Sequence, residues 1–564
     1  MCRMDQFSAA GEDGAAEAAT ASGASGASSA DAGATGDNGT SAQTGAGGGA
    51  DPGTGPGPGP GRGVERGAET GNRTGGGESE GAPQAWAALG GDPALLARVA
   101  RTRRPGLLPS ALPVQELAAA TVTACALAAA EFSCVRERSA VLPSVQVDDG
   151  AVAAAFHSER HLRIDGRDPV NFAPLSRYWR TSDGWVRTHA NYPHHRARLL
   201  GALGLGTEDG SGSGSTGTTG GTGATADDEA FAAKVAAEFA GREAVEVEDA
   251  VFAAGGLAVA VRTPHAWLAH PQRAAVVNAP LVATSRLDNA PPLPLDGRPG
   301  PGGLQGLRVL DLTRVLAGPV ATRTLGLLGA DVLRIDPPQY PELTDTYADT
   351  GLGKRSTALD LASRSGQATF EELLASAHVV VTGYRPGALD RFGLAPESLA
   401  DRRPGLVVGQ LCAWGGSGPW QRRRGFDSLV QAATGIAHIE GEARAAGGED
   451  APGAMPAQAL DHGSGYLLAG ALLRCLTEQR TGTGGSRVVR LALARTAEWL
   501  LRELPREQDT GPAHPFDPTP WTAEADSPLG RLRHVRSPVA FGRHTPSTWT
   551  RMPGPPGTDP SAWS

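Results

Sequence analysis

The strongest constraint on the fold of this sequence is an alternation of short apolar runs with helical segments, which begins near residue 307. Residues 307–312 predict a strand, residues 320–328 carry apolar side chains at helical spacing, and residues 332–335 predict a second strand. A strand–helix–strand unit of this length favours parallel strands joined by a right-handed crossover. Because the alternation repeats as far as residue 415, the sequence predicts an α/β fold with a Rossmann-like parallel sheet.

The turn after the first strand argues against a dinucleotide site. Asp336 ends the second strand, where a ribose-binding acid lies in dinucleotide-binding folds. However, residues 316–321 read LAGPVA, which lacks the G-x-G-x-x-G pattern, and Pro319 removes an amide that a pyrophosphate would need. We therefore expect a Rossmann-like sheet without a nicotinamide cofactor.

The remainder of the chain varies in composition. Residues 1–84 are mostly Gly, Ala, Ser, Thr and Pro, and we expect them to be disordered because they bury too little apolar area to offset their ordering entropy. Residues 85–286 have a globular composition and predict a smaller α+β domain placed N-terminal to the sheet. The predicted divisions are a tail at 1–84, a small domain at 85–286 with a flexible linker at 206–228, a linker at 287–303, the sheet domain at 304–504 and a mostly irregular C-terminal tail at 505–564.

Several elements are predicted in front of the sheet domain. They are helices over 86–100, 112–132, 194–203, 231–240 and 244–254, and hairpins over 144–158 and 177–192, the first of which would turn at residues 148–150. Next to the second hairpin lie His189, His194 and His195. Because no acidic or cysteine partner stands at a suitable spacing, we interpret them as an exposed polar loop and not as a metal site.

Charge and cysteine usage exclude several classes of protein. The formal net charge of −9 predicts no general attraction to nucleic acid or to anionic membranes. The five cysteines are widely spaced and form no C-x-x-C pair, so neither a disulfide framework nor a zinc site is expected. The sequence predicts no secretory signal and no membrane span, since residues 117–130, the most apolar run, are bounded by Glu116 and Glu131. We therefore expect a cytoplasmic protein.

Six segments in the same order resemble the family III CoA-transferases, the group that includes formyl-CoA and carnitine CoA-transferases. The segments are LDLTRVLAGPVATRTLGLLGADVLRID (310–336), GKRSTALDL (353–361), GYRPGALDRFGL (383–394), GGSGPW (415–420), GFDSLVQAATG (425–435) and ALDHGSGYL (459–467). The ordered set is far more specific than any single member. The resemblance implies that residues 304–504 form the catalytic domain of a CoA-transferase.

The resemblance assigns Asp461 as the nucleophile. On the residues alone, Asp461 could equally be the N-cap of the apolar helix that follows it. In the family chemistry this aspartate takes up an acyl group and then CoA, so that CoA passes from an acyl-CoA to a free carboxylic acid through an aspartyl-CoA thioester. Acyl-CoA is then a substrate, and neither a tightly bound cofactor nor a metal is required. Gly463 would let the backbone approach the reacting carbonyl closely.

The same resemblance implies which residues contact CoA. Arg334, Lys354, Arg355 and Arg385 lie in motifs that carry CoA contacts in the family, and we expect them at the carboxyl ends of the parallel strands. Asp427 matches an acidic residue near the active site of formyl-CoA transferase.

Two departures from the family pattern leave alternatives open. The segment that resembles the family's small domain precedes the catalytic stretch, whereas in the family it follows, and the family's glycine-rich loop has no convincing match. A non-catalytic CoA-binding or assembly protein therefore remains an alternative. An α-methylacyl-CoA racemase is disfavoured, because the histidine of its G-H-D motif is Phe426 in this sequence, which cannot act as a base. Since family III enzymes are interlocked homodimers, we expect a homodimer.

Overall fold

The computed structural model describes residues 81–170, 172–205, 226–445, 451–482, 484–505 and 516–564. Its main feature is a seven-stranded sheet in the order β10-β9-β8-β11-β12-β13-β7. Its strands are β7 (Ala283–Arg286), β8 (Arg308–Leu312), β9 (Asp331–Asp336), β10 (Lys354–Ala358), β11 (Val379–Thr382), β12 (Val407–Cys412) and β13 (Arg487–Ala492). All neighbours are parallel except β7, which pairs antiparallel with β13. The predicted α/β fold class is confirmed.

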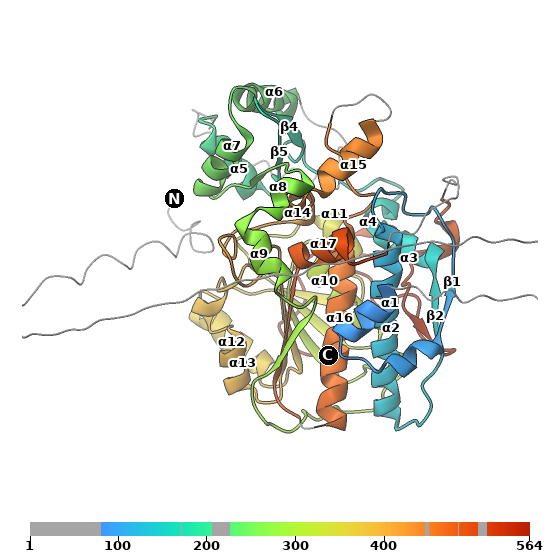
Figure 1. Cartoon of the computed structure of the whole chain (residues 1–564). Coiled ribbons are helices and arrows are strands. Elements are labelled where there is room, and N and C mark those ends of the chain that lie inside the picture. Colours follow the sequence, from blue (N-terminus) through green and yellow to red (C-terminus); the bar gives the residue numbers. More distant parts are fainter. Residues whose placement is uncertain (1–80, 171, 206–225, 446–450, 483, 506–515) are drawn as a thin grey trace, which may run out of the picture. The chain divides into compact units, whose positions relative to one another are not determined.

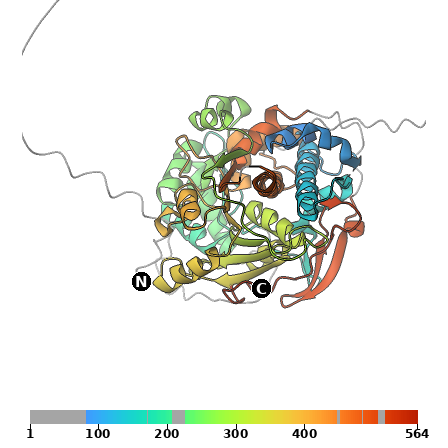
Figure 2. The same cartoon turned by 90° about the horizontal axis from the view of Figure 1, so that it is seen from below.

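The strands are apolar on both faces because helices cover both faces of the sheet. Along β11, Val379 and Val381 enter one hydrophobic core, while Val380, between them, enters the other. Such double burial explains why parallel strands read as nearly continuous apolar runs. One face is covered by α10 (Ala317–Leu327), α16 (Ala459–Thr481), α17 (Leu493–Arg502) and α14 (Asp427–Thr434), and the other by α12 (Arg364–Leu374) and α13 (Pro396–Arg402) (Figures 1 and 2).

A second long helix, α2 (Val114–Glu137), lies alongside α16. The two backbones approach closely, since a Cβ on Gly470 would lie 3.2 Å from the Cα of Cys125. By length and composition α2 is the one helix among the described residues that could cross a membrane, but 83% of its apolar window is buried inside the protein. The helix predicted over 112–132 is confirmed, and its apolar character matches its place in the core.

A smaller unit precedes the main sheet and has its own core. Its antiparallel sheet comprises β4 (Tyr178–Arg180), β5 (Trp185–Thr188) and β6 (Ala258–Ala260). Its helices are α5 (Pro193–Ala202), α6 (Ala226–Ala240) and α7 (Ala244–Ala253), and they pack on this sheet. The hairpin predicted over 177–192 is confirmed. The predicted tail at 1–84 and linker at 206–228 fall mostly outside the described residues.

The hairpin predicted over 144–158 is wrong. The chain forms β2 (Val145–Asp148) and then turns directly into α3 (Asp149–Phe156). The reason is Asp148, whose carboxylate accepts hydrogen bonds from the amides of Gly150 and Ala151 and so caps the helix. The helix predicted over 86–100 is also shorter, because α1 (Gly81–Ala88) is followed by a 3-10 turn (Pro93–Arg98) and by β1 (Val99–Thr102).

Segments far apart in the sequence share the remaining sheets. Residues 505–564 were predicted to be mostly irregular, but they hold β14 (Thr522–Ser527), β15 (Gly530–Val535) and β16 (Ala540–Phe541). β15 pairs with β3 (Arg163–Ile164), and β16 pairs with β2, which also pairs with β1. The predicted domain division stays a prediction, but its parts are interleaved, since β7 also joins the main sheet from ahead of the 287–303 stretch.

The other helices are α4 (Ser158–His161), α8 (Pro264–Leu268), α9 (Pro271–Val277), α11 (Thr344–Thr350), α15 (Ile436–Ala445) and the 3-10 turns Asp390–Phe392 and Thr519–Trp521.

Candidate functional site

A cavity of about 260 Å³ lies next to Asp461. It is lined by residues of the sheet domain and by residues that precede this domain in the sequence. The β8–α10 turn, α11 and the first turns of α14 and α16 form one side, and residues from 159 to 192 form the other. Its lining residues are Glu159, Arg160, Phe172, His189, Asn191, Tyr192, Val315, Leu316, Leu343, Thr346, Phe426, Asp427, Ser428, Gln458 and Asp461. Six of these fifteen residues precede the main sheet in the sequence, and nine belong to the sheet domain.

Asp461 lies in the first turn of α16 and does not cap it. Gln458 occupies the N-cap position, and the backbone N–H of Asp461 donates a 3.0 Å hydrogen bond to Oδ2 of Asp427. Gln431 donates a 2.5 Å hydrogen bond to the other oxygen of Asp427. The capping role that the residue pattern allowed for Asp461 therefore belongs to Asp427, which reaches it from α14. The Asp461 carboxyl is left beside the cavity, at the positive end of the helix dipole.

The two carboxyl groups resist ionising together. Burial raises the pKa of Asp461 well above its usual range, and the nearby carboxylates of Asp427 and Glu159 raise it further. Burial also raises the pKa of Asp427 to about 6, although hydrogen bonds from Gln431 and from backbone amides favour its charged form. Because Asp427 receives these hydrogen bonds, we assign the negative charge to Asp427 and the proton to Asp461 when the cavity is empty.

Glu159 enters this site from α4. One of its carboxylate oxygens, Oε2, lies 3.2 Å from Nε2 of His462, the residue that follows Asp461. The ring of His462 is fully buried and stacks on Phe156, with ring centroids 5.2 Å apart. Glu159 and His462 therefore lie close to Asp461, and neither was predicted from the sequence as a site residue.

The histidines predicted to form an exposed polar loop are corrected by the structure. His189 and His195 are buried, at 3% and 4% exposed, because the small unit folds against the first turn of α14. The His189 ring lies flat on Phe426, with centroids 3.7 Å apart and planes inclined by 1°. Burial, with the positive charge of Arg187, lowers the pKa of His189 to about 3, so its imidazole is neutral. No local pattern in the sequence indicates this burial, since residues 189 and 461 come to line the same cavity only through the tertiary fold.

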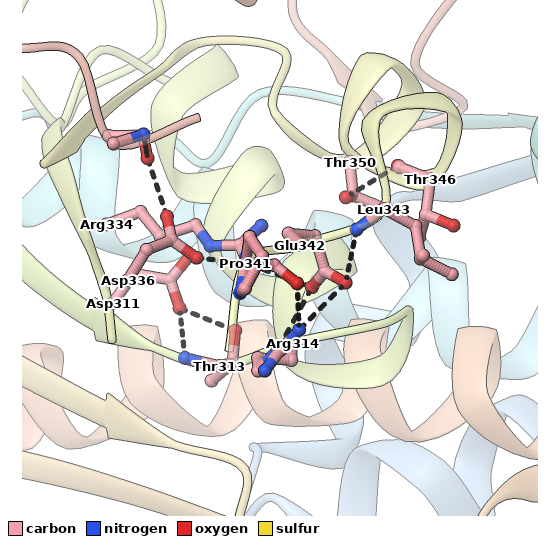
Figure 3. A network of polar contacts seen from close by, with 12 residues as sticks. Asp311, Thr313, Arg314, Arg334, Asp336, Pro341, Glu342, Leu343, Thr346 and Thr350 are labelled. Atoms are coloured by element: carbon pink, nitrogen blue, oxygen red, sulfur yellow. Dashed lines mark hydrogen bonds and ion pairs between the residues drawn. The ribbon is translucent and has the colours of Figure 1, made fainter. Parts of the chain in front are cut away.

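A buried network of ion pairs adjoins the cavity, since Tyr192 and Leu343 line the cavity and bond to Glu342. Figure 3 shows this network. Arg334 is fully buried between Asp336 at 2.7 Å and Glu342 at 2.9 Å. Tyr192, from the small unit, donates a 2.6 Å hydrogen bond to Glu342, which also pairs with Arg314. Burial alone would raise the pKa of Glu342, but Arg314 and Arg334 hold it down at about 2. Arg334 therefore stabilises the fold next to the cavity, and its predicted contact with CoA stays a prediction.

Lys354 and Arg355 lie at the amino end of β10, whereas the sequence predicted them at carboxyl ends of strands. Lys354 is buried, its Nζ is 3.0 Å from Oδ2 of Asp311, and burial lowers its pKa to about 8. Arg355 pairs with Asp331 at 2.8 Å. Both charges are thus neutralised inside the sheet domain. Their CoA contacts stay predictions.

Arg385 is the predicted CoA contact that does follow a strand end. It comes after β11 and lines a second cavity, of about 490 Å³, together with Arg490 and Arg495. The carboxyl ends of β11, β12 and β13 open into this cavity, which is where ligands bind in open α/β sheets. Burial lowers the pKa of Arg385, with Arg422 and Arg391 lowering it further.

Gly463 faces α2 and not the cavity. A Cβ at this position would lie 2.7 Å from Cδ2 of Leu117. Its neighbour Gly465 faces α10, where a Cβ would lie 2.6 Å from the carbonyl oxygen of Ala317. These glycines let three helices converge behind Asp461. Among the described residues, no group of three or more His, Cys, Asp or Glu side chains could hold a metal ion.

Comparison with known proteins identifies the sheet domain. Residues 304–519 match the model of CoA-transferase family III. The chain is 29% identical over 277 residues to a probable fatty acyl-CoA transferase of Mycobacterium tuberculosis, a match that covers 44% of this chain and 67% of that protein. It is 33% identical to the mouse succinyl-CoA:glutarate CoA-transferase, over 32% of this chain and 43% of the relative.

Solved structures give similar partial matches. A crystal structure of the Mycobacterium tuberculosis protein matches at 32% identity and a TM-score of 0.32, over 36% of this chain and 58% of that one. A CAIB/BAIF family protein from Brucella suis matches at 28% identity and the same TM-score of 0.32, over 36% of this chain and 55% of that one. The chain thus spans about half the length of several of these relatives. Residues 304–519 of this chain thus match CoA-transferase family III.

Proposed function

We propose that this protein is a CoA-transferase that moves CoA from an acyl-CoA to a free carboxylic acid, with Asp461 as the nucleophile. The observation that carries the proposal is the carboxyl of Asp461, which borders a cavity at the head of α16 within the segment that matches the family. The relatives named above are an acyl-CoA transferase and a succinyl-CoA:glutarate CoA-transferase, which supports the same class of reaction.

The chemistry exchanges one activated acyl bond for another. The Asp461 carboxylate attacks the thioester carbon of the acyl-CoA, a C–O bond forms, and the C–S bond breaks to give a mixed anhydride and CoA thiolate. The thiolate then attacks the aspartyl carbonyl, which releases the donor acid and leaves an aspartyl-CoA thioester. The acceptor carboxylate repeats the two steps in reverse and departs as a new acyl-CoA. Asp461 is restored at the end of the cycle.

Asp461 must lose its proton before it can attack. Burial and the carboxylates of Asp427 and Glu159 raise its pKa, so the empty site holds it neutral. Activity should therefore rise with pH until Asp461 is ionised. Its position at the amino end of α16 favours the charged form once a substrate excludes water from the cavity.

The second cavity suits the phosphorylated part of CoA. Its volume of about 490 Å³, its place at three carboxyl strand ends and its arginines Arg385, Arg490 and Arg495 fit a diphosphate-bearing ligand. The acyl group would occupy the smaller cavity, whose wall is largely apolar and aromatic. The two cavities share the β12–α14 region of the chain, through residues 410–417 in one and 426–428 in the other.

The test combines exchange with trapping. Purified protein is incubated with a panel of acyl-CoAs and labelled carboxylic acids, and exchange is followed by mass spectrometry beside a CoA-binding titration. Asp461→Asn should abolish exchange while leaving CoA binding unchanged, and hydroxylamine should trap an adduct on Asp461 in the wild type only. Binding without exchange over the whole panel would favour a non-catalytic CoA-binding protein. Full activity of Asp461→Asn would refute the assigned nucleophile.

We also propose a homodimer located in the cytoplasm. The resemblance to the family III enzymes, which are interlocked homodimers, supports the dimer. Light scattering on the purified full chain tests the dimer, and a monomer with full exchange activity would overturn it.

A further inference from the structure

Two buried polar side chains on the wall of the smaller cavity have no hydrogen-bond partner among the described residues. They are His189, through Nδ1, and Ser428, through Oγ. His189 is 3% exposed and Ser428 is 7% exposed. Buried polar groups are nearly always hydrogen-bonded, so an unpaired pair beside a cavity indicates polar atoms of a ligand that bind there.

Packing fixes the orientation of both groups. The coplanar stack on Phe426 holds the His189 ring, and β5 and the backbone bond from the His189 amide to Leu257 hold its backbone. Ser428 lies in the first turn of α14, directly after Asp427. His189 therefore stacks on Phe426, and Ser428 follows Phe426 by two residues at the start of α14. The same first turn of α14 carries Asp427, which binds the amide of Asp461.

We propose that His189 and Ser428 are catalytic residues that donate hydrogen bonds to the carbonyl oxygen on which negative charge develops when Asp461 attacks the thioester. This inference rests on the proposed transferase activity. In the attack, the C–O bond to Asp461 forms and the π electrons of the carbonyl move onto its oxygen. His189 N–H and Ser428 O–H donate to that oxygen without transferring a proton, and the C–S bond then breaks as the carbonyl re-forms.

A donor of this kind must stay protonated at one nitrogen and uncharged over the working pH range. The neutral imidazole of His189 meets this requirement, because burial and Arg187 lower its pKa to about 3. The same low pKa argues against His189 as a proton acceptor for Asp461, since an imidazole with a pKa of about 3 is a weak base. The hydroxyl of Ser428 needs no change of charge to donate.

The experiment uses aromatic and isosteric replacements in the full chain. His189→Phe keeps a ring against Phe426 but removes the N–H, while His189→Gln loses the ring but keeps a donor. Ser428→Ala removes only the hydroxyl. Matched controls are His195→Phe, a second buried imidazole with an unpaired Nδ1 that does not line the cavity, and Ser464→Ala, a buried hydroxyl bonded to Thr496.

Loss of one oxyanion donor lowers kcat about 10²–10³-fold in enzymes of known mechanism. We expect such a fall in kcat for His189→Phe and Ser428→Ala, with KM and CoA affinity within about threefold of wild type. His189→Gln should be at least about tenfold more active than His189→Phe, and the double variant should lose less than the product of the single losses. The acidic limb of the pH–rate profile should stay in place.

Three results would overturn the inference. They are a kcat within threefold of wild type for both His189→Phe and Ser428→Ala, an equal loss in the matched controls, or a shift of the pH–rate profile with His189→Phe, which would indicate a proton acceptor. Circular dichroism and the CoA titration show whether each variant is folded, and His189→Gln supplies the comparison if His189→Phe is not. A wild-type protein without exchange activity would instead refute the proposed function.

Discussion

The amide nitrogen of Asp461 lies 3.0 Å from Oδ2 of Asp427, so the two carboxyl groups of the cavity are joined through the backbone of α16. Asp427 thereby caps the helix that presents the nucleophile. Because two neighbouring buried carboxyl groups resist ionising together, the free energy of unfolding should depend on pH.

Asp461→Asn should make the protein more stable at alkaline pH. Burial, with the Asp427 and Glu159 carboxylates, raises the pKa of Asp461, so the folded state holds this proton more tightly than the unfolded chain. The resulting stabilisation is present below the unfolded pKa and is lost as pH rises through the folded pKa. Between the unfolded and the folded pKa, the variant should gain on wild type by up to about 1.4 kcal/mol per pH unit, and the gain should level off above the folded pKa. Urea unfolding from pH 5 to pH 9 measures the free energy of unfolding of the variant and of the wild type. A difference between them that does not change with pH would contradict the assigned pKa shift.

Two replacements of Asp427 should separate its role as a helix cap from the effect of its charge on the pKa of Asp461. Asp427→Ala leaves the amide of Asp461 and the side chain of Gln431 without their acceptor, which should cost about 1–3 kcal/mol. Asp427→Asn keeps an acceptor but removes the charge, and so should cost less. Both changes remove a carboxylate that raises the pKa of Asp461, and the acidic limb of the pH–rate profile should move to lower pH. An unmoved limb in both variants would show that the two carboxyls do not interact.

The sheet could be predicted from the sequence because each strand and helix has a pattern that lies within its own residues. Apolar runs such as Val379–Thr382 are continuous where a parallel strand is buried on both faces, and the helices between them have a clear period. The family resemblance depends on continuous motifs, such as residues 310–336 and 459–467, which can be read without knowledge of the tertiary contacts. The failed hairpin at 144–158 shows the limit, because an acidic turn residue can instead cap a helix, as Asp148 does.

The site was only partly predictable because much of it is made by long-range contacts. Asp461 and Asp427 lie in family motifs, and the structure brings them together. His189 and Glu159 carry no motif, and they join the cavity only when the small unit and α4 fold against α14 and α16. The misplaced arginines and lysine have a different cause. Counting a charge in a motif does not reveal its internal partner, such as Glu342 for Arg334 or Asp311 for Lys354.

Glu342→Ala should strongly destabilise the fold. It removes one partner of Arg334, which is fully buried, and leaves Tyr192 and Arg314 without their acceptor. Breaking a buried ion pair in this way costs about 3–5 kcal/mol. Glu371→Ala is the control, because its pair with Arg402 is solvent-exposed and should contribute less than about 1 kcal/mol. Denaturant unfolding at pH 7 distinguishes them, and similar losses for both would mean that the network is not stabilising.

The Glu342 network should also persist in acid. Arg314 and Arg334 hold the pKa of Glu342 at about 2, against burial, so its stabilising charge is present above its unfolded pKa. That contribution decreases as pH falls below the unfolded pKa and is lost once pH has fallen through the folded value near 2. The destabilisation by Glu342→Ala should therefore be constant from pH 7 to pH 5 and should shrink below pH 4, as unfolding curves at each pH would show.

Arg385→Ala should weaken CoA binding through the phosphates. Loss of one charge-assisted hydrogen bond of about 1.5–3 kcal/mol corresponds to a Kd raised about 10–100-fold. Pantetheine, which lacks the phosphates, should bind both proteins equally. Arg531→Ala is the control, since Arg531 forms an exposed pair with Glu524, lines neither cavity and should change the Kd less than about twofold. Calorimetric titration with both ligands measures the two Kd values, and an equal loss for Arg531→Ala would mean that Arg385 makes no specific contact with CoA.

Gly465→Ala and Gly463→Ala should differ although the residues are two positions apart. At Gly465 the new methyl group would lie 2.6 Å from the backbone carbonyl oxygen of Ala317, so α10 or α16 must move. Overpacking of this kind costs about 1–3 kcal/mol. At Gly463 it would meet only the end of the Leu117 side chain, which can rotate, and alanine offers up to about 1 kcal/mol of helix propensity over glycine.

We therefore expect Gly463→Ala to change the free energy of unfolding by less than about 1 kcal/mol and to keep most of the activity, because its methyl group points to α2 and away from the cavity. Gly465→Ala should lower both stability and kcat, since it displaces the first turn that carries Asp461. Thermal unfolding and exchange rates of the two variants are measured side by side. If Gly463→Ala abolished turnover in a fully stable protein, the backbone at this glycine would approach the reacting carbonyl, as the family resemblance implies.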